Sequence, residues 1–443
     1  MRAAAALSLP HRTRLEALGQ RGIRLGLAAI DSVCERLGRP ERRVPSVLVA
    51  GTNGKGSTAA TLAAIAGAAG MRAGLYTSPH LERVNERIRI GDQDIGDGEL
   101  DAELGEVFAA ADRAPAIPLT YFEASTAAAF GAFARRSLDL AVLEVGLGGR
   151  FDATNVTPAI LSVVTSISLD HVEELGGTIA SIALEKAGVF RAGRPALVAG
   201  RRPEALAVFE DVAAQTGARL HRLGAEAWIE AGKPSLLGTR FDLTTPAGRY
   251  ALATPLPGAH QAENAAAAVR AAELLSPGFR IPADAIARGV AAVRWPGRLE
   301  RFEVRGRTVL VDGCHNADGA RALAEFLRDG GLRADLVFGA MADKDIEAMG
   351  ETLAPAVGRI RLVRASESPR AASPEDLARR FAPGRPETLA SESLEAALDG
   401  LLAEPGADSI IVAGSLYLVG EARGALLSGR FEGARRPRER RSI

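Results

Sequence analysis

The sequence predicts an α/β protein with two domains, each built on a mostly parallel sheet. Its 443 residues exceed what one hydrophobic core usually organises. Short aliphatic or β-branched runs alternate with alanine-rich helical stretches, as in successive βαβ units. The alternation is interrupted at Trp295-Pro296-Gly297 and then resumes. We therefore expect a larger domain over residues 1–296 and a smaller, Rossmann-like domain over residues 297–435.

The expected elements of each domain follow from these runs. In the first domain, strands are expected at residues 46–50, 141–145 and 159–166, and helices at residues 59–71 and 263–275. In the second domain, strands are expected at residues 308–311, 336–338, 360–363 and 409–413, separated by helix patterns.

Composition argues against several classes of protein. The 54 basic and 54 acidic residues cancel, so no overall positive field attracts nucleic acid or an anionic membrane. The longest apolar-rich stretch, residues 59–71, is shorter than the roughly 20 residues of a membrane-spanning helix. No signal peptide is recognisable, and Cys34 and Cys314 fit neither a disulfide framework nor a zinc cluster. We expect a cytoplasmic monomer that binds neither nucleic acid nor membrane.

Lysine is rare in this chain. Arginine supplies nearly all of the 54 basic residues, and the lysines are Lys55, Lys186, Lys233 and Lys344. A lysine retained in such a chain indicates a place that needs a compact primary amine. For Lys233 and Lys344, random retention explains the residue equally well.

The C-terminal end is strongly basic. Residues 435–441 contain five arginines. A run of like charges predicts a flexible, solvated tail, which we place at residues 436–443. Weak contact with a polyanion is the alternative interpretation.

A glycine-rich loop follows the first strand. It reads Gly51-Thr52-Asn53-Gly54-Lys55-Gly56-Ser57-Thr58, and a helix pattern comes next. Backbone N–H groups of such a loop hold phosphate oxygens, the lysine reaches the β- and γ-phosphates, and a hydroxyl binds Mg²⁺. The common spacing is not met, because Val49 replaces the first glycine and Gly56 follows the lysine, so Ser57 or Thr58 must supply the hydroxyl. The loop predicts an ATP site.

This loop resembles the nucleotide loop of the Mur ligase superfamily. With its extra glycine, the loop is similar to that of the folate branch, which contains the folylpolyglutamate synthases and the bifunctional dihydrofolate synthases. Further motifs of that branch follow in order along the chain, at residues 76–81, 143–155, 170–171, 185–188, 260–261, 264–265, 296–298, 312–316, 338–345 and 414–417.

Glu144 and His171 are the candidate metal ligands. Each follows an apolar run, and the carboxyl ends of strands are where α/β sheets place their ligands. With the hydroxyls of Ser57 and Ser78, they form an oxygen-rich set suited to Mg²⁺. The resemblance implies in addition that Lys186 is carbamylated by CO₂ and helps to hold a second ion. Guanidinium cannot undergo this change, and a lysine on a helix surface is the alternative interpretation.

The resemblance also implies the remaining binding residues. Asn264, Arg298 and Asp312 would contact ATP, while His315 and Ser415 would lie near the incoming glutamate, with His315 catalytic beside Lys55 and Lys186. The pterin end is expected at Ile23, Arg24, Leu25, Thr120, Phe122 and Asp152, with Phe122 stacking on the flat ring.

The chain departs from the family pattern at two places. Ala28 and Ala29 stand where the family usually has a Glu-Arg pair, so pterin contacts differ there. Cys314 replaces the usual alanine, and we interpret it as a packing residue, because an ATP ligase needs no cysteine nucleophile.

Together these parts imply an ATP-dependent amide ligase. ATP, two Mg²⁺ ions and Lys55 would convert a carboxylate to an acyl phosphate, which the α-amine of L-glutamate then attacks. The acid would be dihydropteroate, a reduced folate or both, and a bifunctional enzyme is favoured over a folylpolyglutamate synthase alone. Because the loop and Asp312 fall in different expected domains, domain closure is expected to assemble the site.

Three other functions are weighed against this one. A peptidoglycan-precursor ligase needs a UDP-binding domain before the loop, for which the 46 residues before Val47 are too few. A P-loop switch protein would turn over ATP without glutamate. A non-catalytic ATP-binding scaffold would form no amide, and the retained Lys55, Glu144, His171 and Lys186 argue against it.

Overall fold

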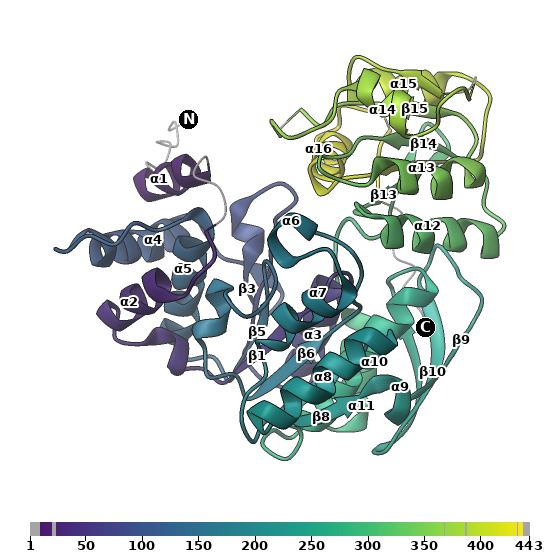
Figure 1. The fold of residues 1–443 in the computed structure, drawn as a ribbon. Helices are drawn as coiled ribbons and strands as arrows, with labels where there is room; N and C mark the ends of the chain where they lie inside the picture. Colours follow the sequence, from purple (N-terminus) through teal and green to yellow (C-terminus); the bar gives the residue numbers. More distant parts are fainter. Residues whose placement is uncertain (1–8, 20–23, 367, 386–387, 432, 437–443) are drawn as a thin grey trace, which may run out of the picture. The chain divides into compact units, whose positions relative to one another are not determined.

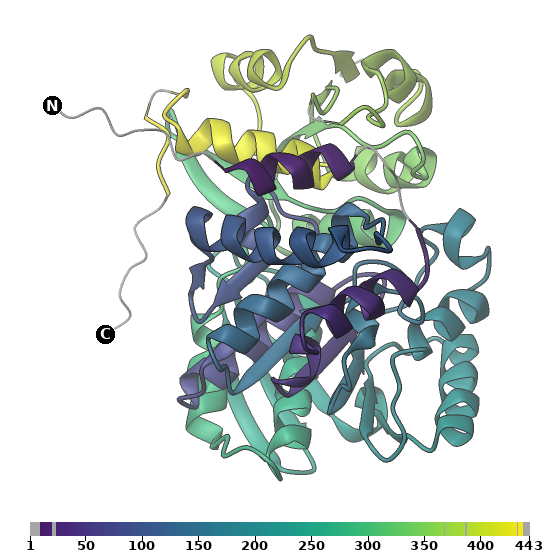
Figure 2. The same cartoon turned by 90° about the vertical axis from the view of Figure 1, so that its left-hand side faces the viewer.

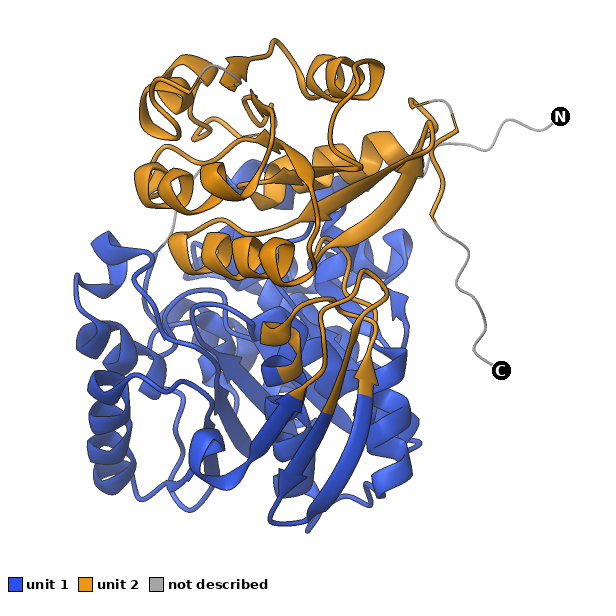
Figure 3. Ribbon diagram, turned by 90° about the vertical axis from the view of Figure 1, so that its right-hand side faces the viewer, with its two compact units in different colours: residues 1–230, 242–252, 263–293 blue, residues 231–241, 253–262, 294–443 orange. Residues whose placement is uncertain are grey.

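A computed structural model describes residues 9–19, 24–366, 368–385, 388–431 and 433–436 of the chain. It divides into two compact units (Figure 3). Unit 1 comprises Met1–Glu230, Asp242–Leu252 and Glu263–Val293, and unit 2 comprises Ala231–Phe241, Ala253–Ala262 and Arg294–Ile443. The expected domain limits at residues 296 and 435 stay a prediction.

Unit 1 is built on an eight-stranded sheet with the order β4-β3-β2-β5-β1-β6-β7-β8. The strands from β2 to β8 in this order run parallel, whereas β3 and β4 are antiparallel to their neighbours. All residues of the central strands are buried, as expected of a parallel sheet covered on both faces. The strands are β1 (Ser46–Ala50), β2 (Ala73–Tyr76), β3 (Ile88–Ile90), β4 (Gln93–Asp94), β5 (Leu140–Glu144), β6 (Leu161–Val164), β7 (Pro195–Val198) and β8 (Arg219–Arg222).

Helices flank this sheet. Helix α3 packs on β1, β2 and β5, and α11 packs on α3 (Figure 1). Gly289 permits this close approach, because a Cβ there would overlap the backbone of Ile65. Helices α1, α4 and α5 pack together (Figure 2). The α-helices up to residue 292 are α1 (Pro10–Leu18), α2 (Ala28–Arg36), α3 (Lys55–Ala68), α4 (Asp97–Asp112), α5 (Tyr121–Arg135), α6 (Val172–Leu175), α7 (Ile179–Ala187), α8 (Pro203–Thr216), α9 (Leu223–Glu226), α10 (Ala259–Leu275) and α11 (Ala283–Ala292), with short 3₁₀ turns η2 (Pro40–Arg42), η3 (Val84–Arg87) and η4 (Ala153–Val156).

A three-stranded sheet follows α9 in the chain, with the order β11-β10-β9. Its strands are β9 (Trp228–Ala231), β10 (Thr239–Thr245) and β11 (Gly248–Thr254). Burial alternates along β10, as it does when one face of a strand packs and the other meets solvent. The division between the two units passes through these strands (Figure 3).

Unit 2 is built on a six-stranded sheet with the order β12-β13-β17-β14-β15-β16. Only β12 is antiparallel to its neighbour among the pairs of this sheet that the described residues form. Its strands and helices are β12 (Glu300–Val304), β13 (Arg307–Asp312), α12 (Ala317–Asp329), β14 (Ala334–Phe338), α13 (Ile346–Leu353), η5 (Ala354–Ala356), β15 (Ile360–Leu362), α14 (Pro374–Arg380), β16 (Thr388–Ala390), α15 (Leu394–Ala403), β17 (Ser409–Ala413) and α16 (Leu416–Leu427).

The expected elements are present, with shifted ends. Strand β6 ends at Val164, before the expected residue 166, because the segment after it turns toward the glycine loop. Helix α3 begins at Lys55, inside the loop, since Gly54 adopts the left-handed conformation that starts it. Helix α10 begins at Ala259, four residues before the expected start. Over the described residues, no helix is long and apolar enough to cross a membrane.

Candidate functional site

Three neighbouring strands of unit 1 end side by side. The parallel register pairs Val49 of β1 with Glu144 of β5, and Ala50 with Val164 of β6. Because carboxyl ends of parallel strands meet at one edge, the segments that follow them leave the sheet together. The glycine loop, Glu144 and the segment leading to His171 therefore share this edge.

The loop backbone requires glycine at two places. Gly51 has φ 143° and Gly54 has φ 85°, both in the region that side chains disfavour. A Cβ at Gly51 would overlap the hydroxyl of Thr165, and a Cβ at Gly54 would overlap the amide of Asn264. Asn264 thus lies directly against the loop, and its backbone carbonyl accepts a hydrogen bond from the Thr58 hydroxyl (3.4 Å).

Hydroxyl side chains after β6 hold the loop in this shape. The Thr165 hydroxyl donates to the carbonyl of Asn53 (2.7 Å), and the Ser166 hydroxyl donates to the same oxygen (3.1 Å). The amide of Thr52 donates to the Ser166 carbonyl (2.7 Å), and the Ser168 amide donates to the Thr52 hydroxyl (3.1 Å). Sequence reasoning missed these residues, although a run of hydroxyl residues directly after a buried strand was a visible signal.

Two lysines bind the carbonyls of this loop. Lys55 Nζ donates to the Thr52 carbonyl (3.0 Å), and Lys186 Nζ donates to the Gly51 carbonyl (2.9 Å). Lys186 lies in the last turn of α7 and is only 4% exposed, so the alternative of a surface lysine is wrong. Burial, and then the charge of Lys55, lower the pKa of Lys186 to about 7. Lys186 is therefore a buried amine that loses its proton near neutral pH.

The candidate metal ligands occupy the same edge of the sheet or the elements that follow it. Glu144 is 5% exposed and accepts a hydrogen bond from the Ser78 amide (3.2 Å), which joins the ends of β5 and β2. Ser57 is buried in the first turn of α3, and His171 precedes α6 with φ 51°. No group of three or more His, Cys, Asp or Glu gathers among the described residues, so a metal here would depend on hydroxyl oxygens as well. A buried carboxylate, with Ser57 and Ser78 on neighbouring segments as further oxygen donors, suits a hard cation such as Mg²⁺.

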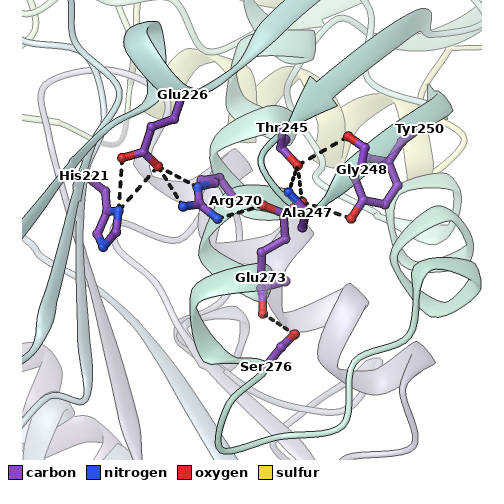
Figure 4. Close-up of polar contacts among 10 residues, drawn as sticks. His221, Glu226, Thr245, Ala247, Gly248, Tyr250, Arg270, Glu273 and Ser276 are labelled. Atoms are coloured by element: carbon purple, nitrogen blue, oxygen red, sulfur yellow. Dashed lines mark hydrogen bonds and ion pairs between the residues drawn. The ribbon is translucent and has the colours of Figure 1, made fainter.

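A charged network in unit 1 anchors the far end of α10, the helix that carries Asn264 (Figure 4). Arg270 donates to Glu226 (2.8 Å) and to Glu273 (2.9 Å), and Tyr250 also donates to Glu273 (2.9 Å). Burial, followed by the bond to Glu273, raises the pKa of Tyr250 to about 12, so the phenol keeps its proton. The network thus fixes the helix at the end opposite to Asn264.

The expected pterin residues fall into two contact groups, the first with Leu25, Phe122 and Asp152 and the second with Arg24 and Thr120. The backbone of Gly26, next to Leu25, donates to the Phe151 carbonyl (3.4 Å). A Cβ on Gly146 would overlap the Phe122 ring and touch Asp152, so both residues lie against this glycine. Burial raises the pKa of Asp152, although its carboxylate accepts bonds from the amides of Leu147 (2.9 Å) and Thr154 (3.0 Å). Ile23 lies outside the described residues.

Glu123 contacts Arg24 and Thr120 of the second pterin group, and it was not predicted from the sequence. Its Oε2 accepts hydrogen bonds from the Thr120 amide (2.8 Å), the Thr120 hydroxyl (2.8 Å) and the Arg24 guanidinium (2.9 Å). The carboxylate is buried, whereas Arg24 is about half exposed. The Thr-x-x-Glu spacing at the start of α5 signals a capping box, which explains the Thr120 bonds but not the arginine.

The site residues of unit 2 gather at the carboxyl edge of its sheet. The register pairs Asp312 of β13 with Ala413 of β17, so the segments that hold His315 and Ser415 start together. Asp312 accepts hydrogen bonds from the amides of Leu299 and Cys314 (both 3.0 Å), and His315 Nδ1 donates to the Gly313 carbonyl (2.9 Å). Ser415 caps α16 by accepting from the Leu418 amide (3.1 Å).

Two further residues of unit 2 complete this group. Arg298 packs against Gly313, where a Cβ would overlap its guanidinium, and so it lies beside the end of β13. Cys314 is a free, buried cysteine in the hydrophobic core, which confirms its packing role.

Known proteins and protein families match this chain over most of its length. Residues 49–272 match the Mur ligase middle domain, and residues 297–416 match the glutamate ligase domain of Mur ligases. The chain is 36% identical over 409 residues to folylpolyglutamate synthase of Lacticaseibacillus casei, covering 90% of this chain and 94% of that protein.

Solved structures give the same result for the fold. FolC of Escherichia coli in complex with DHPP and ADP is 34% identical, with a TM-score of 0.85 over 97% of this chain and 100% of that one. The bifunctional folylpolyglutamate synthase/dihydrofolate synthase of Yersinia pestis, complexed with AMPPNP and a Mn ion, is 33% identical, with a TM-score of 0.82 over 96% of this chain and 100% of that one. The fold is therefore that of a Mur ligase, and the chain belongs to the Mur ligase family, in the branch of the folylpolyglutamate and dihydrofolate synthases.

Proposed function

We propose that this protein is an ATP-dependent ligase that joins L-glutamate to dihydropteroate and to the γ-carboxylate of reduced folates through an acyl phosphate. The observation that carries the proposal is the glycine loop with Lys55 and the buried Lys186 bound to its carbonyls. A carboxylate alone is a poor acyl donor, and phosphorylation by ATP supplies the leaving group that the amine of glutamate displaces. Membership of the ligase family supports this reaction over a P-loop switch protein or a non-catalytic ATP-binding scaffold.

The nucleotide is assigned to the loop and to residues of both units. Residues 51–58 and Asn264 would hold the phosphates in unit 1, and Arg298 and Asp312 would contact ATP from unit 2. Lys55 would leave the Thr52 carbonyl for the β- and γ-phosphates and neutralise charge on the transferring group. Ser57 is preferred as the metal-binding hydroxyl, because the Thr58 hydroxyl donates to the Asn264 carbonyl.

Two Mg²⁺ ions are assigned to Ser57, Ser78, Glu144, His171 and the carbamate of Lys186. When bound, the ions would neutralise phosphate charge and polarise the transferring group. The Yersinia relative, which is complexed with AMPPNP and a Mn ion, supports the use of ATP with a divalent metal here. The lowered pKa of Lys186 supports carbamylation, since CO₂ reacts with the neutral amine.

The acid and the amine are assigned to separate groups of residues. Arg24, Leu25, Thr120, Phe122 and Asp152, with Ile23, would bind the pterin end. His315 and Ser415 would bind glutamate, with His315 near the reacting amine. The Escherichia coli relative in complex with DHPP supports a dihydropteroate-type substrate, and the bifunctional Yersinia relative supports both activities in one protein.

The test is incubation of the full chain with ATP, Mg²⁺, L-glutamate and either dihydropteroate or tetrahydrofolate, with products identified by mass. Amide products from both acids are expected. Product from tetrahydrofolate alone would show that the protein is a folylpolyglutamate synthase only. The Lacticaseibacillus relative carries that name. ATP turnover that does not depend on glutamate would favour the switch protein, and intact, ATP-bound protein without amide product would favour the scaffold.

The predicted state of the protein is a cytoplasmic monomer. Cys34 and Cys314 are both free and buried, which suits a reducing compartment. Analytical ultracentrifugation of the full chain tests the monomer, for which a single species of 46.2 kDa is expected.

Replacing Gly54 by alanine should weaken ATP binding by at least about tenfold. The added Cβ meets the Asn264 amide at a residue with φ 85°. Gly70→Ala is the matched control, because Gly70 has φ 87° and no atom within 4 Å of its Cβ position. It bears the same backbone strain without the collision. Isothermal titration with ATP and Mg²⁺ measures the effect, and equal affinities for the two variants would contradict the assignment of the loop.

Glu123→Gln should raise the KM for dihydropteroate by about tenfold and leave the KM for ATP within twofold. Glutamine can still accept from Thr120, but it removes the charge that holds the Arg24 guanidinium. Steady-state kinetics measures both constants. Glu99→Gln is the control, because Glu99 also pairs with an arginine, Arg136, on the exposed surface. A selective rise in the KM for ATP would show that Glu123 serves a different substrate.

A further inference from the structure

The C-terminal segment of unit 2 returns to the start of its own sheet. Arg435 N donates to the Glu303 carbonyl (3.0 Å), and Glu303 N donates to the Arg435 carbonyl (2.8 Å), so the segment forms an antiparallel bridge with β12. Strand β12 is at the edge of the six-stranded sheet. Arg435 therefore covers part of an edge that other chains could otherwise pair with.

This bridge places Arg436 on the Glu300 carboxylate. Arg436 Nη2 lies 2.5 Å from Glu300 Oε1, and its guanidinium lies 5.9 Å from the centre of the buried Phe302 ring. Arg423 of α16 donates from Nε to Glu300 Oε2 (3.0 Å). The side chains of Glu300 and Arg423 are 13% and 15% exposed. Two arginines from different elements thus hold one largely buried carboxylate.

The same carboxylate holds the loop that carries Arg298. Glu300 Oε2 accepts a hydrogen bond from the amide of Gly297 (3.0 Å), while the Gly297 carbonyl accepts one from the amide of Gly313 (2.8 Å). On the other side of Arg298, the amide of Leu299 donates to Asp312 (3.0 Å). The backbone is thereby fixed both before and after Arg298.

The loop needs such contacts because its backbone is strained at Leu299. Gly297 has φ 72° and Leu299 has φ 49°. Leucine rarely adopts the left-handed region, and a residue held there needs its surroundings to impose the shape. Loss of the Glu300 contact would leave the residues around Arg298 free to relax into another conformation.

We propose that Glu300, Arg423 and Arg436 form a clamp that positions Arg298 for ATP. These three are positioning residues, because they act through the backbone of residues 297–299 rather than on the substrate. The inference rests on the proposed contact between Arg298 and ATP. Arg436, which the sequence placed in the basic tail, holds Glu300 in this structure, and residues 437–443 lie outside the described residues.

Equilibrium binding of ATP and Mg²⁺ to the full chain tests the clamp. Arg436→Ala should raise the Kd for ATP about threefold, as expected for an ion pair whose arginine is half-exposed, and Glu300→Gln on the order of tenfold. Arg430→Ala is the matched control, because Arg430 is an exposed arginine of the same C-terminal region that pairs with Glu395 (2.8 Å). It should bind ATP as the wild type does.

A double-mutant cycle separates positioning from general destabilisation. If the clamp acts through Arg298, Arg436→Ala should change the Kd for ATP no further in an Arg298→Ala background. Independent, multiplicative losses in the double variant would overturn the proposal. An unchanged Kd in both Arg436→Ala and Glu300→Gln would overturn it as well.

The proposed function and the clamp are tested by different measurements. ATP binding is measured without ligation, so the clamp is tested even in a chain that forms no amide. Absence of amide product together with the expected Kd changes would overturn the proposed function and support the clamp. Amide product with unaffected Kd values in the clamp variants would do the reverse.

Discussion

Replacing Lys55 by alanine should lower the rate of acyl phosphate formation on the order of a thousandfold and leave the fold intact. Lys55 is the first residue of α3, and its Nζ lies over the glycine loop, 3.0 Å from the Thr52 carbonyl. The side chain is only half-buried, so its removal leaves no cavity in the core. What is lost is the positive charge that would face the transferring phosphoryl group. Trapping the acyl phosphate with hydroxylamine in the absence of glutamate measures this step.

Lys233→Ala is the control for the Lys55 variant. Lys233 is an exposed lysine in unit 2, so this change removes the same charge away from the loop and should leave the rate unchanged. Loss of Lys55 also removes a charge that lowers the pKa of Lys186, so the Lys186 pKa should rise in the variant. Normal turnover of Lys55→Ala would contradict the assignment of the loop to ATP.

The positions that the sequence predicted well are those governed by local pattern. Buried strands such as β1 and β17 have the bounds expected from their apolar runs, because a central parallel strand must be apolar on both faces. Gly51 and Gly54 were expected in a phosphate loop, and their positive φ values explain why no other residue fits. Local sequence carries this information because the constraint lies within a few residues.

The positions that the sequence did not predict depend on long-range contacts. Thr165 and Ser166 hold Asn53 from 112 and 113 positions away, and Arg24 reaches Glu123 across 99 positions. Arg436 lies 136 positions from Glu300. The run of like charges predicted that this arginine belongs to a solvated tail. Nothing near it in the sequence indicates the edge strand beside which it lies. Such pairings follow from strand order, which a single sequence does not specify.

Replacing Lys186 by arginine should be nearly as damaging as the loss of Lys55, with a fall in kcat of at least about a hundredfold, although the positive charge is kept. Burial and the charge of Lys55 lower the pKa of Lys186 to about 7, so the neutral amine is abundant at neutral pH. Guanidinium stays protonated and cannot add CO₂. The larger arginine must also fit where Nζ now donates to the Gly51 carbonyl at 2.9 Å. Steady-state kinetics of amide formation measures the loss.

The pH dependence of the wild type separates loss of the carbamate from loss of packing. Below about pH 7, Lys186 gains a proton, so less amine can react with CO₂ and activity at a fixed, limiting CO₂ concentration should fall as the pH is lowered. Added bicarbonate should restore activity above pH 7 and restore less of it below. Lys186→Arg should not respond to bicarbonate at any pH, whereas Lys186→Ala, which leaves space for a small carboxylate, should recover part of its activity with formate. Activity of Lys186→Arg close to that of the wild type would show that the reaction needs no carbamate.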